Sequence, residues 1–419
     1  MHLPPMIAAL RRHKLTCCLL VLQVAATCAV VCNTAYLVLQ RIARVDAPSG
    51  LHAPGLSLLT LSLAQSHDGQ LAQYLADADA LRRIPGVQSA ALLDGVPYQG
   101  VEASGVACVD LEAFHRMLAA HAVVPGCANP AFYRGGPQVL RTLGLTLVAG
   151  RDFRADEYQP GKGDYLIGDS AVTIVSQSLA QRLWPGQSAV GRMIYFGRSM
   201  LRGQGRQVVG VVRHLQRGKL RRAIDYDQAL LVPVEPAEVS VLFAVRSAPQ
   251  DQARVLAAAE QLLDRRHPDR LQEADFGRSY AQIRAAYFQR DATMIGLLVA
   301  SALGLLFVTA LGIAGLANFW VQQRTRSIGI RRALGATRGD ILRYFQGENL
   351  LIVGAGVLLG ILLALALNQW LMRHYELSRL PAWYLPLGAA LLWLLGQGAV
   401  LAPALRAARV PPMVATRTG

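Results

Sequence analysis

The chain has 419 residues, of which 53% are hydrophobic and 16% are charged, and its mean hydropathy is +0.30. This composition is too apolar and too poor in charge for a typical soluble protein. The formal net charge of +15 would suit a nucleic-acid-binding protein, but the arginines are spread around hydrophobic segments instead of gathering in one soluble stretch. That distribution excludes a nucleic-acid partner.

Four runs without Asp, Glu, Lys or Arg are long enough to cross a membrane. Each exceeds the roughly 20 residues that a helix needs to span the hydrocarbon core. A buried helix of a soluble protein rarely stays apolar on every face over such a length, so a secreted soluble protein is excluded as well. The runs cover residues 15–40, 292–323, 349–372 and 380–405. We therefore predict four transmembrane helices, the last of them at 385–405.

The first run has a second interpretation as a cleaved signal peptide, because the basic residues Arg11, Arg12 and Lys14 precede it. Its 26 residues exceed the ~7–15 residues of the usual apolar region of a signal peptide. Its end, Tyr36-Leu37-Val38-Leu39-Gln40, also lacks a small-x-small cleavage site. We expect the run to remain as an anchor.

The positions of the arginines predict which side of the membrane each segment occupies. Arginines are frequent in residues 1–14, 324–348 and 406–419, whereas the short segment 373–384 carries few cations. Both termini and the 324–348 segment are therefore expected in the cytoplasm. Residues 41–291 and the 373–384 loop would then lie outside the plasma (inner) membrane of a bacterium, in the periplasm or the extracellular space.

Residues 41–291 are predicted to form a large mixed α/β domain. A mostly β insertion at about 150–235 would interrupt a lobe of strands and helices, and a stalk helix at about 272–291 would return to the membrane. In chain order, we expect a strand at 56–63, a helix at 69–84, strands at 87–93 and 172–175, a helix at 178–184, strands at 208–212, 230–234 and 239–245, and a helix at 252–266.

This external region shows no catalytic or metal-binding pattern. It has no G-x-x-x-x-G-K-[ST] phosphate loop and no H-E-x-x-H motif. His115 and His121 are six residues apart, which does not place them on one helix face as two metal ligands would require. We expect a protein that is not an enzyme and that binds no metal and no cofactor.

Two of the six cysteines, Cys108 and Cys127, fall in the external region. That compartment is oxidising in most bacteria, so the two residues could form a disulfide. Two unpaired thiols are the alternative, because a sequence does not fix the distance between them. The other four cysteines lie in the first run, where we interpret them as small apolar packing residues.

An arginine-rich segment at 324–348, which we call the elbow, follows the second predicted span. Arg324, Arg331 and Arg338 recur every seven residues, which predicts that they line one side of a helix. The apolar residues on another side of this helix would be Ile330, Ala333, Leu334 and Ile341.

A turn is predicted inside the elbow. Gly335 can end the first helix, and Thr337 with Asp340 has the spacing of a capping box that starts the next one. Two interpretations of the first helix stay open. It would either rest on lipid headgroups, with its arginines on the phosphates, or dock a cytoplasmic partner.

Small residues in the spans predict close helix packing. They recur at four-residue intervals, or multiples of four, at Ala300, Gly304 and Gly312 and at Gly356, Gly360 and Ala364. Such faces pack either within one chain or between two, and we favour a dimer. The isolated polar residues Gln23, Asn33 and Gln397 are expected to form helix–helix hydrogen bonds instead of a substrate path.

The order of the predicted parts is one anchor helix, an external domain of about 250 residues and three clustered helices. This order resembles that of the MacB/FtsX-like ABC transporter permeases, the type VII or mechanotransmission family. The segment Ile328-Gly329-Ile330-Arg331-Arg332-Ala333-Leu334-Gly335-Ala336-Thr337 is similar to the signature that follows the second helix of this family. The segment 403–412, PALRAARVPP, is similar to its usual ending. Leu143-Gly144-Leu145 and Gly150-Arg151-Asp152-Phe153 resemble parts of the family's periplasmic core domain.

The resemblance implies a mechanism. Two permeases, identical or paralogous, would each dock on a separate cytoplasmic ABC ATPase, which would hold the ATP and Mg²⁺. A periplasmic adaptor and an outer-membrane channel are further partners of some family members. The implied ATPase contacts are Arg324, Ser327, Ile328, Gly329, Arg331, Arg332, Ala333, Leu334, Gly335, Ala336 and Thr337. Family members commonly carry Glu where this chain has Ser327, which puts the usual acidic contact in doubt.

Two functions follow as expectations from the resemblance. The first is a permease that relays ATP-driven motion to the external domain and expels a small amphiphile, a peptide or a lipid-linked cargo. The second is a mechanical signalling subunit that regulates a cell-wall hydrolase or a sensor. The large external domain with its β insertion favours export, because the cell-division type generally has a smaller one.

Overall fold

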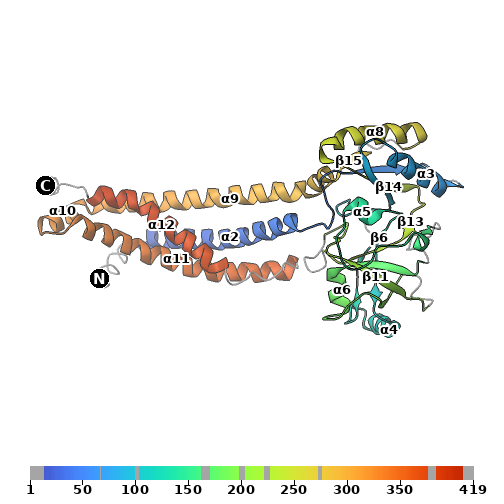
Figure 1. The fold of residues 1–419 in the computed structure, drawn as a ribbon. Helices are drawn as coiled ribbons and strands as arrows, with labels where there is room; N and C mark the ends of the chain where they lie inside the picture. The colour runs from blue at the N-terminus through green and yellow to red at the C-terminus, as the bar shows by residue number, and fades with distance from the viewer. Residues whose placement is uncertain are drawn as a thin grey trace. The chain divides into compact units, whose positions relative to one another are not determined.

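The computed structural model describes residues 14–66, 68–99, 103–161, 170–197, 203–220, 227–271, 276–375 and 384–408 (Figure 1). The chain divides into two compact units, a membrane unit of residues 1–45 and 290–419 and an external unit of residues 46–289. Most of the predicted tails at 1–14 and 406–419 and of the loop at 373–384 lie outside the described residues, as does the side chain of Arg332.

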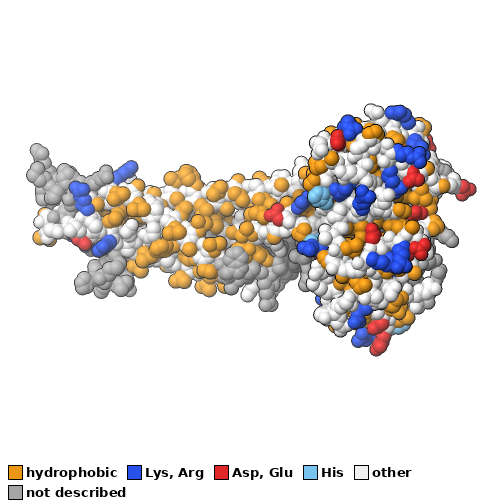
Figure 2. Space-filling view, in the orientation of Figure 1, with side chains coloured by type: hydrophobic (Ala, Val, Ile, Leu, Met, Phe, Trp, Pro, Cys, Tyr) orange, Lys and Arg blue, Asp and Glu red, His pale blue; other side chains and the backbone are white. Residues whose placement is uncertain are grey.

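The membrane unit is helical. Four of its helices are long and apolar enough to cross a membrane, which confirms the four predicted spans. They are α2 (Lys14–Asp46), α9 (Tyr280–Gln323), α11 (Arg338–Tyr375) and α12 (Tyr384–Ala408), and the short α10 (Thr325–Ala333) follows α9. On the face drawn in Figure 2, hydrophobic side chains cover this unit between its two ends. That surface suits hydrocarbon, where a charge is costly.

Small residues of α11 bring this helix close to α2. A Cβ atom built on Gly356 would lie 2.7 Å from the Cβ of Val24, and one built on Gly360 would lie 2.4 Å from the Cβ of Cys28. Ala364, one further step along the stripe, is fully buried. This stripe is therefore used for packing inside one chain.

Of the second predicted stripe of small residues, in α9, only one glycine packs against another helix. A Cβ atom on Gly312 would meet the Gln23 side chain at 2.8 Å, whereas Gly304 has no such neighbour within 4 Å. Gln23 Nε2 also donates to a carbonyl of α9 at 3.3 Å, and Asn33 Nδ2 donates to the carbonyl oxygen of Ala364 at 3.3 Å. These contacts confirm the predicted helix–helix hydrogen bonds. The prediction is wrong for Gln397, whose buried Nε2 has no acceptor among the described residues.

Gly360→Ala tests the packing of α11 on α2. The added methyl group would meet the Cβ of Cys28 and the carbonyl oxygen of Ala25, at 2.9 Å, so the backbones must separate. We expect a destabilisation of about 1–3 kcal/mol, measured as a lower melting temperature of the purified protein. Gly354→Ala is the matched control, because no atom lies within 4 Å of its added carbon. Equal melting temperatures for the two variants would contradict this packing.

The external unit contains two sheets. The first is antiparallel and has the order β15-β1-β14-β2. Its strands are β1 (Leu56–Ser62), β2 (Val87–Leu93), β14 (Ser240–Ser247) and β15 (Gly277–Ser279). Helices α3 (Gln70–Arg82) and α8 (Gln252–Arg266) pack on it around a core that includes Leu59, Tyr74 and Phe243. We call this part lobe 1.

The second sheet is mixed and has nine strands in the order β3-β6-β12-β9-β11-β10-β4-β5, with β7 paired to β11. These strands are β3 (Ala103–Ser104), β4 (Ala107–Cys108), β5 (Cys127–Ala128), β6 (Ala131–Arg134), β7 (Leu147–Gly150), β9 (Val172–Ser176), β10 (Met193–Phe196), β11 (Arg206–Val212) and β12 (Ala229–Val232). Its helices are α4 (Leu111–Ala120) and α6 (Gln177–Leu183), whereas α5 (Val139–Leu143) packs against β2 and β14 of lobe 1. A small pair joins β8 (Gln159–Pro160) to β13 (Val234–Glu235). We call this part lobe 2.

The predicted elements lie within two residues of the observed ends, but two predicted boundaries are wrong. The insertion starts at Ala103 and not near 150, because strands of two residues carry no alternating pattern that sequence reading detects. The predicted stalk helix begins only at Tyr280, since residues 277–279 pair with β1. Ser279 and Gln282 form a capping box there, with Gln282 N donating to Ser279 Oγ at 3.2 Å.

Candidate functional site

The elbow has the predicted turn. Gly335 has a φ of +98°, and Ala336 N donates to the carbonyl oxygen of Arg331 at 3.0 Å, which closes α10 in a Schellman motif. Thr337 N donates to Asp340 Oδ2 at 3.0 Å and Asp340 N donates to Thr337 Oγ1 at 3.2 Å. These reciprocal bonds are the predicted capping box, and α11 begins directly after Thr337.

The arginines do not line one helix, and that prediction is wrong. Arg324 lies between α9 and α10, Arg331 lies in α10, and Arg338 is the first residue of α11. The seven-residue spacing would align them only in a continuous helix, which the turn at Gly335 interrupts.

A buried carboxylate holds the elbow in place. Glu348 in α11 is 1% exposed, and Arg324 Nη1 donates to its two oxygens at 2.8 and 2.9 Å. The Tyr344 hydroxyl donates to Glu348 Oε1 at 3.1 Å, and the Arg331 guanidinium lies 4.9 Å from the centre of the Tyr344 ring. The end of α9, α10 and α11 are thus tied together. Glu348 is not among the predicted site residues, although an acid at the edge of a charge-free run is a visible signal.

The apolar residues of the elbow divide into two sets. Ile328 and Ile341 are buried in the core of the membrane unit, so the prediction that Ile341 shares a face with Leu334 is wrong. Ile330 is 48% exposed and Leu334 is 83% exposed. Residues 327, 330, 331 and 334 follow helical spacing. We call the exposed residues Ser327, Ile330, Arg331 and Leu334 the elbow surface.

The other predicted ATPase contacts are placed as follows. Ala333, Gly335 and Thr337 are exposed, Ala336 is half-buried and Gly329 is buried. Arg324 is used inside the chain by Glu348. Because this arginine already has an acidic partner, the absence of an acid at Ser327 leaves it paired.

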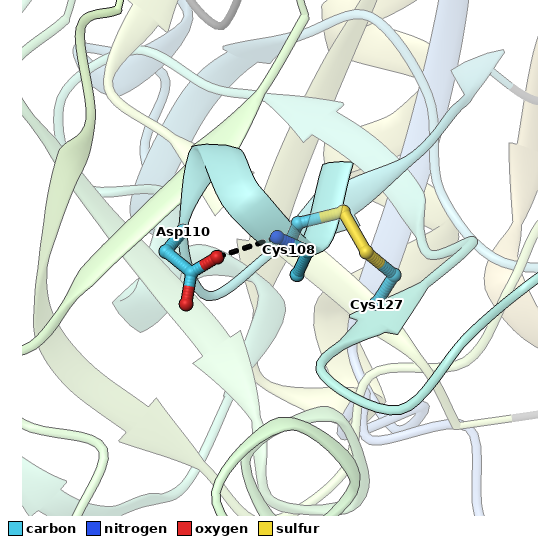
Figure 3. The surroundings of a disulfide bond; sticks show 4 residues. Cys108, Asp110 and Cys127 are labelled. Carbon is cyan, nitrogen blue, oxygen red and sulfur yellow. Dashed lines mark hydrogen bonds between the residues drawn. A yellow bond between two sulfur atoms is a disulfide. The ribbon is translucent and has the colours of Figure 1, made fainter. Parts of the chain in front are cut away.

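Cys108 and Cys127 form a disulfide in lobe 2, where it joins β4 to β5 (Figure 3). Both residues are buried. The neighbouring Asp110 caps α4, since its carboxylate accepts a hydrogen bond from Ala113 N at 2.6 Å. The disulfide therefore holds both ends of the segment that contains α4.

A partly buried arginine joins the lobes of the external unit, and a buried arginine on β14 binds α5 and the segment before β1. Arg134 in lobe 2 forms ion pairs with Asp94, directly after β2, and with Glu238, just before β14. Burial raises the pKa of Asp94, against the opposing effect of Arg134. Arg246 on β14 donates to the carbonyl oxygens of residues 52, 54 and 142, and burial lowers its pKa. The ion pairs of Arg134 therefore connect the two lobes.

The membrane unit also holds a small, partly open pocket near the elbow, between Trp320, Phe345 and Glu348. Apolar residues line most of it, and Trp320 contributes a buried Nε1 with no acceptor among the described residues. Within the same described ranges, no group of three or more His, Cys, Asp or Glu residues could hold a metal ion.

Comparison with known proteins places part of the chain in a family. A family model described as the FtsX-like permease C-terminal domain matches residues 299–412. The macrolide export ATP-binding/permease protein MacB 1 of Aeromonas hydrophila is 30% identical over 325 residues, which cover 74% of this chain and 48% of the relative. The pyoverdine export ATP-binding/permease protein PvdT of Pseudomonas aeruginosa is 29% identical, over 48% of this chain and 30% of that protein. The chain spans less than half the length of these relatives.

Two solved structures align with this chain. The periplasmic region of MacB from Actinobacillus actinomycetemcomitans covers 58% of this chain and 97% of its own length, with 15% identity and a TM-score of 0.34. The extracellular domain of the ABC-type transporter YknZ covers 53% and 98%, with 14% identity and a TM-score of 0.32.

Four membrane-spanning helices, a large mixed α/β extracytoplasmic unit and the match at 299–412 define an integral membrane permease with an FtsX-like domain. The chain is similar to the MacB-type ABC permeases over 74% of its length, and its residues 299–412 belong to the FtsX-like permease domain family.

Proposed function

We propose that this permease is the transmembrane subunit of an ABC exporter whose ATPase is a separate chain. The elbow surface binds the ATPase, and the helices relay its motion to the external unit, which expels a small amphiphile, a peptide or a lipid-linked cargo. The observation that carries this proposal is an exposed apolar and cationic helix, with Leu334 83% exposed, on a segment held by the buried Arg324–Glu348 pair. An exposed leucine on a braced helix suits a docking surface.

The names of the relatives support the pairing of an ATP-binding part with a permease part. Their names combine ATP binding with a permease and give macrolides and pyoverdine as exported molecules. This chain aligns with less than half of each, and its 419 residues contain no G-x-x-x-x-G-K-[ST] loop. We propose that ATP and Mg²⁺ are bound by a partner ATPase chain. We also propose cytoplasmic termini, a second permease copy, and an adaptor with an outer-membrane channel as further partners.

A mechanical signalling subunit is the alternative. Gln23 and Asn33 form helix–helix hydrogen bonds, so these polar groups offer cargo no route between the helices. Both functions share that feature, and the relatives' names favour export. Cells that lack this chain should accumulate a macrolide or a siderophore if it exports such a molecule. Unchanged accumulation together with altered cell-wall hydrolysis would favour signalling.

Leu334→Asp tests the docking surface. The side chain is exposed, so the variant should fold, but the new carboxylate would lie in the apolar contact. We expect the co-purifying ATPase to be lost from mild-detergent extracts of native membranes. Val123→Asp is the control, because Val123 is 51% exposed in the external unit. Equal recovery of the ATPase with both variants would contradict the assignment.

A further inference from the structure

The external unit contains a strained aromatic residue that packs against the first turns of α9. Tyr98 follows β2, is 3% exposed and has a φ of +73°. A bulky residue is rare in this left-handed region, and such a conformation persists only where the surroundings hold it. Burial raises the pKa of Tyr98 to about 12, so its hydroxyl keeps its proton and remains a donor.

The ring of Tyr98 is packed against the first turns of α9. It stacks on Tyr280 with 6.1 Å between ring centres, and it meets Tyr287 at 5.3 Å and Phe288 at 5.0 Å. Residues 280, 287 and 288 lie on one stripe of the helix by their spacing. Tyr280 and Phe288 are buried. The Tyr98 ring therefore contacts the first turns of α9 at three positions.

The hydroxyl of Tyr98 reaches two other segments. It donates to Gln216 Oε1 at 2.5 Å, in the 213–220 loop of lobe 2, and lies 3.4 Å from the carbonyl oxygen of Ala47, directly after α2. The 213–220 loop also contacts the segment after α2 and the start of α9 through bonds that do not involve Tyr98. Gln216 N donates to the carbonyl oxygen of Ser49 at 3.0 Å, and the amide of residue 220 donates to the hydroxyl of Tyr287 at 2.9 Å.

The chain enters the external unit at residue 46 and leaves it at residue 289. Ala47 lies at the first of these ends and Phe288 at the second, and Tyr98 contacts both together with lobe 2. We propose that Tyr98 is a positioning residue that couples displacement of α9 to the 213–220 loop and to the segment after α2. This inference deepens the proposed function and rests on it, because the displacement would come from the ATPase.

Hydrogen–deuterium exchange of the full permease with its ATPase, in lipid nanodiscs, tests this coupling. Exchange is compared with and without ATP and vanadate in residues 213–220 and 277–289. The wild type should respond in both segments. Tyr98→Phe and Gln216→Met each remove one partner of the buried hydrogen bond, and we expect the response at 213–220 to fall roughly tenfold while that at 277–289 persists. Exchange in residues 46–52 is followed in the same samples: the wild type should respond there, and Tyr98→Ala should lose this response as well.

Tyr133→Phe is the matched control. It removes a different hydroxyl that binds the same loop, since Tyr133 donates to the carbonyl oxygen of Gln216 at 2.8 Å, and it leaves the Tyr98–Gln216 bond in place. We expect it to keep the wild-type response. Equal responses in Tyr98→Phe, Gln216→Met and wild type, or equal losses in Tyr98→Phe and Tyr133→Phe, would overturn the coupling role alone. A wild type that binds no ATPase and shows no nucleotide response would overturn the proposed function as well.

Discussion

Arg324→Met is expected to lower the melting temperature of the purified permease by on the order of 10 °C. The substitution leaves the carboxylate of Glu348, 1% exposed, without its cation. Breaking a buried ion pair by removing one partner costs about 3–5 kcal/mol, whereas replacing both partners by apolar residues is often neutral. Arg324→Met/Glu348→Met should therefore recover most of the lost stability. Thermal unfolding in detergent measures both variants.

Arg338→Met is the control for this pair. Arg338 is exposed at the start of α11, so the loss of its charge should change the melting temperature little. If Arg324→Met melts at the same temperature as Arg338→Met, the buried pair does not brace the elbow. The double variant also gives a functional result: if it is stable but no longer binds the ATPase, the position of α10 depends on the pair.

Cys108→Ala/Cys127→Ala is expected to destabilise the external unit by about 3 kcal/mol, because the disulfide closes a loop across a sequence separation of 19. The segment with α4 should open first, since the disulfide holds both its ends. Limited proteolysis within residues 109–126 would measure this opening, alongside the melting temperature.

Chemical reduction of the wild type supplies a second arm of this experiment, because it breaks the bond without deleting the buried sulfur atoms. Cys17→Ala/Cys18→Ala is the control, as these two cysteines are free and lie in α2. Resistance of the reduced protein and of the double variant to proteolysis at 109–126 would contradict the structural role of the disulfide.

The helices of the membrane unit could be predicted from the sequence because the features that define them depend on residues close together in the chain. A charge inside hydrocarbon is costly, so the four charge-free runs mark the spans directly. The capping box of Thr337 and Asp340 and the αL glycine at 335 depend on neighbours along the chain. Local rules of this kind can be read without knowing the fold.

The brace at the elbow could not be predicted in the same way. Arg324 and Glu348 are 24 positions apart, and only the turn at Gly335 brings α11 back beside the end of α9. The prediction from the seven-residue arginine spacing required a continuous helix, and it was wrong because the turn at Gly335 interrupts that helix. The small residues Gly356 and Gly360 did predict close packing, but the sequence could not choose between α2 and a second chain as the neighbour.

The external unit depends most on contacts between distant residues. Its second sheet includes strands of two residues at Ala103 and Ala107, which exist only because other strands pair with them. Tyr98 contacts residues 47, 216 and 280, and none of these lies near it in the sequence. The positive φ of Tyr98 has no sequence signal either, because turn chemistry would place Gly or Asn there.

Photo-crosslinking from position 334 in native membranes tests the central claim most directly. A photoreactive phenylalanine analogue replaces Leu334, and the same analogue at Val123 serves as the control. The account predicts a crosslink, only from position 334, to one cytoplasmic chain that contains a phosphate-binding loop, with a yield that changes when ATP is added. Crosslinks from position 334 to lipid alone would contradict it, and α10 would then be a helix that rests on the membrane surface.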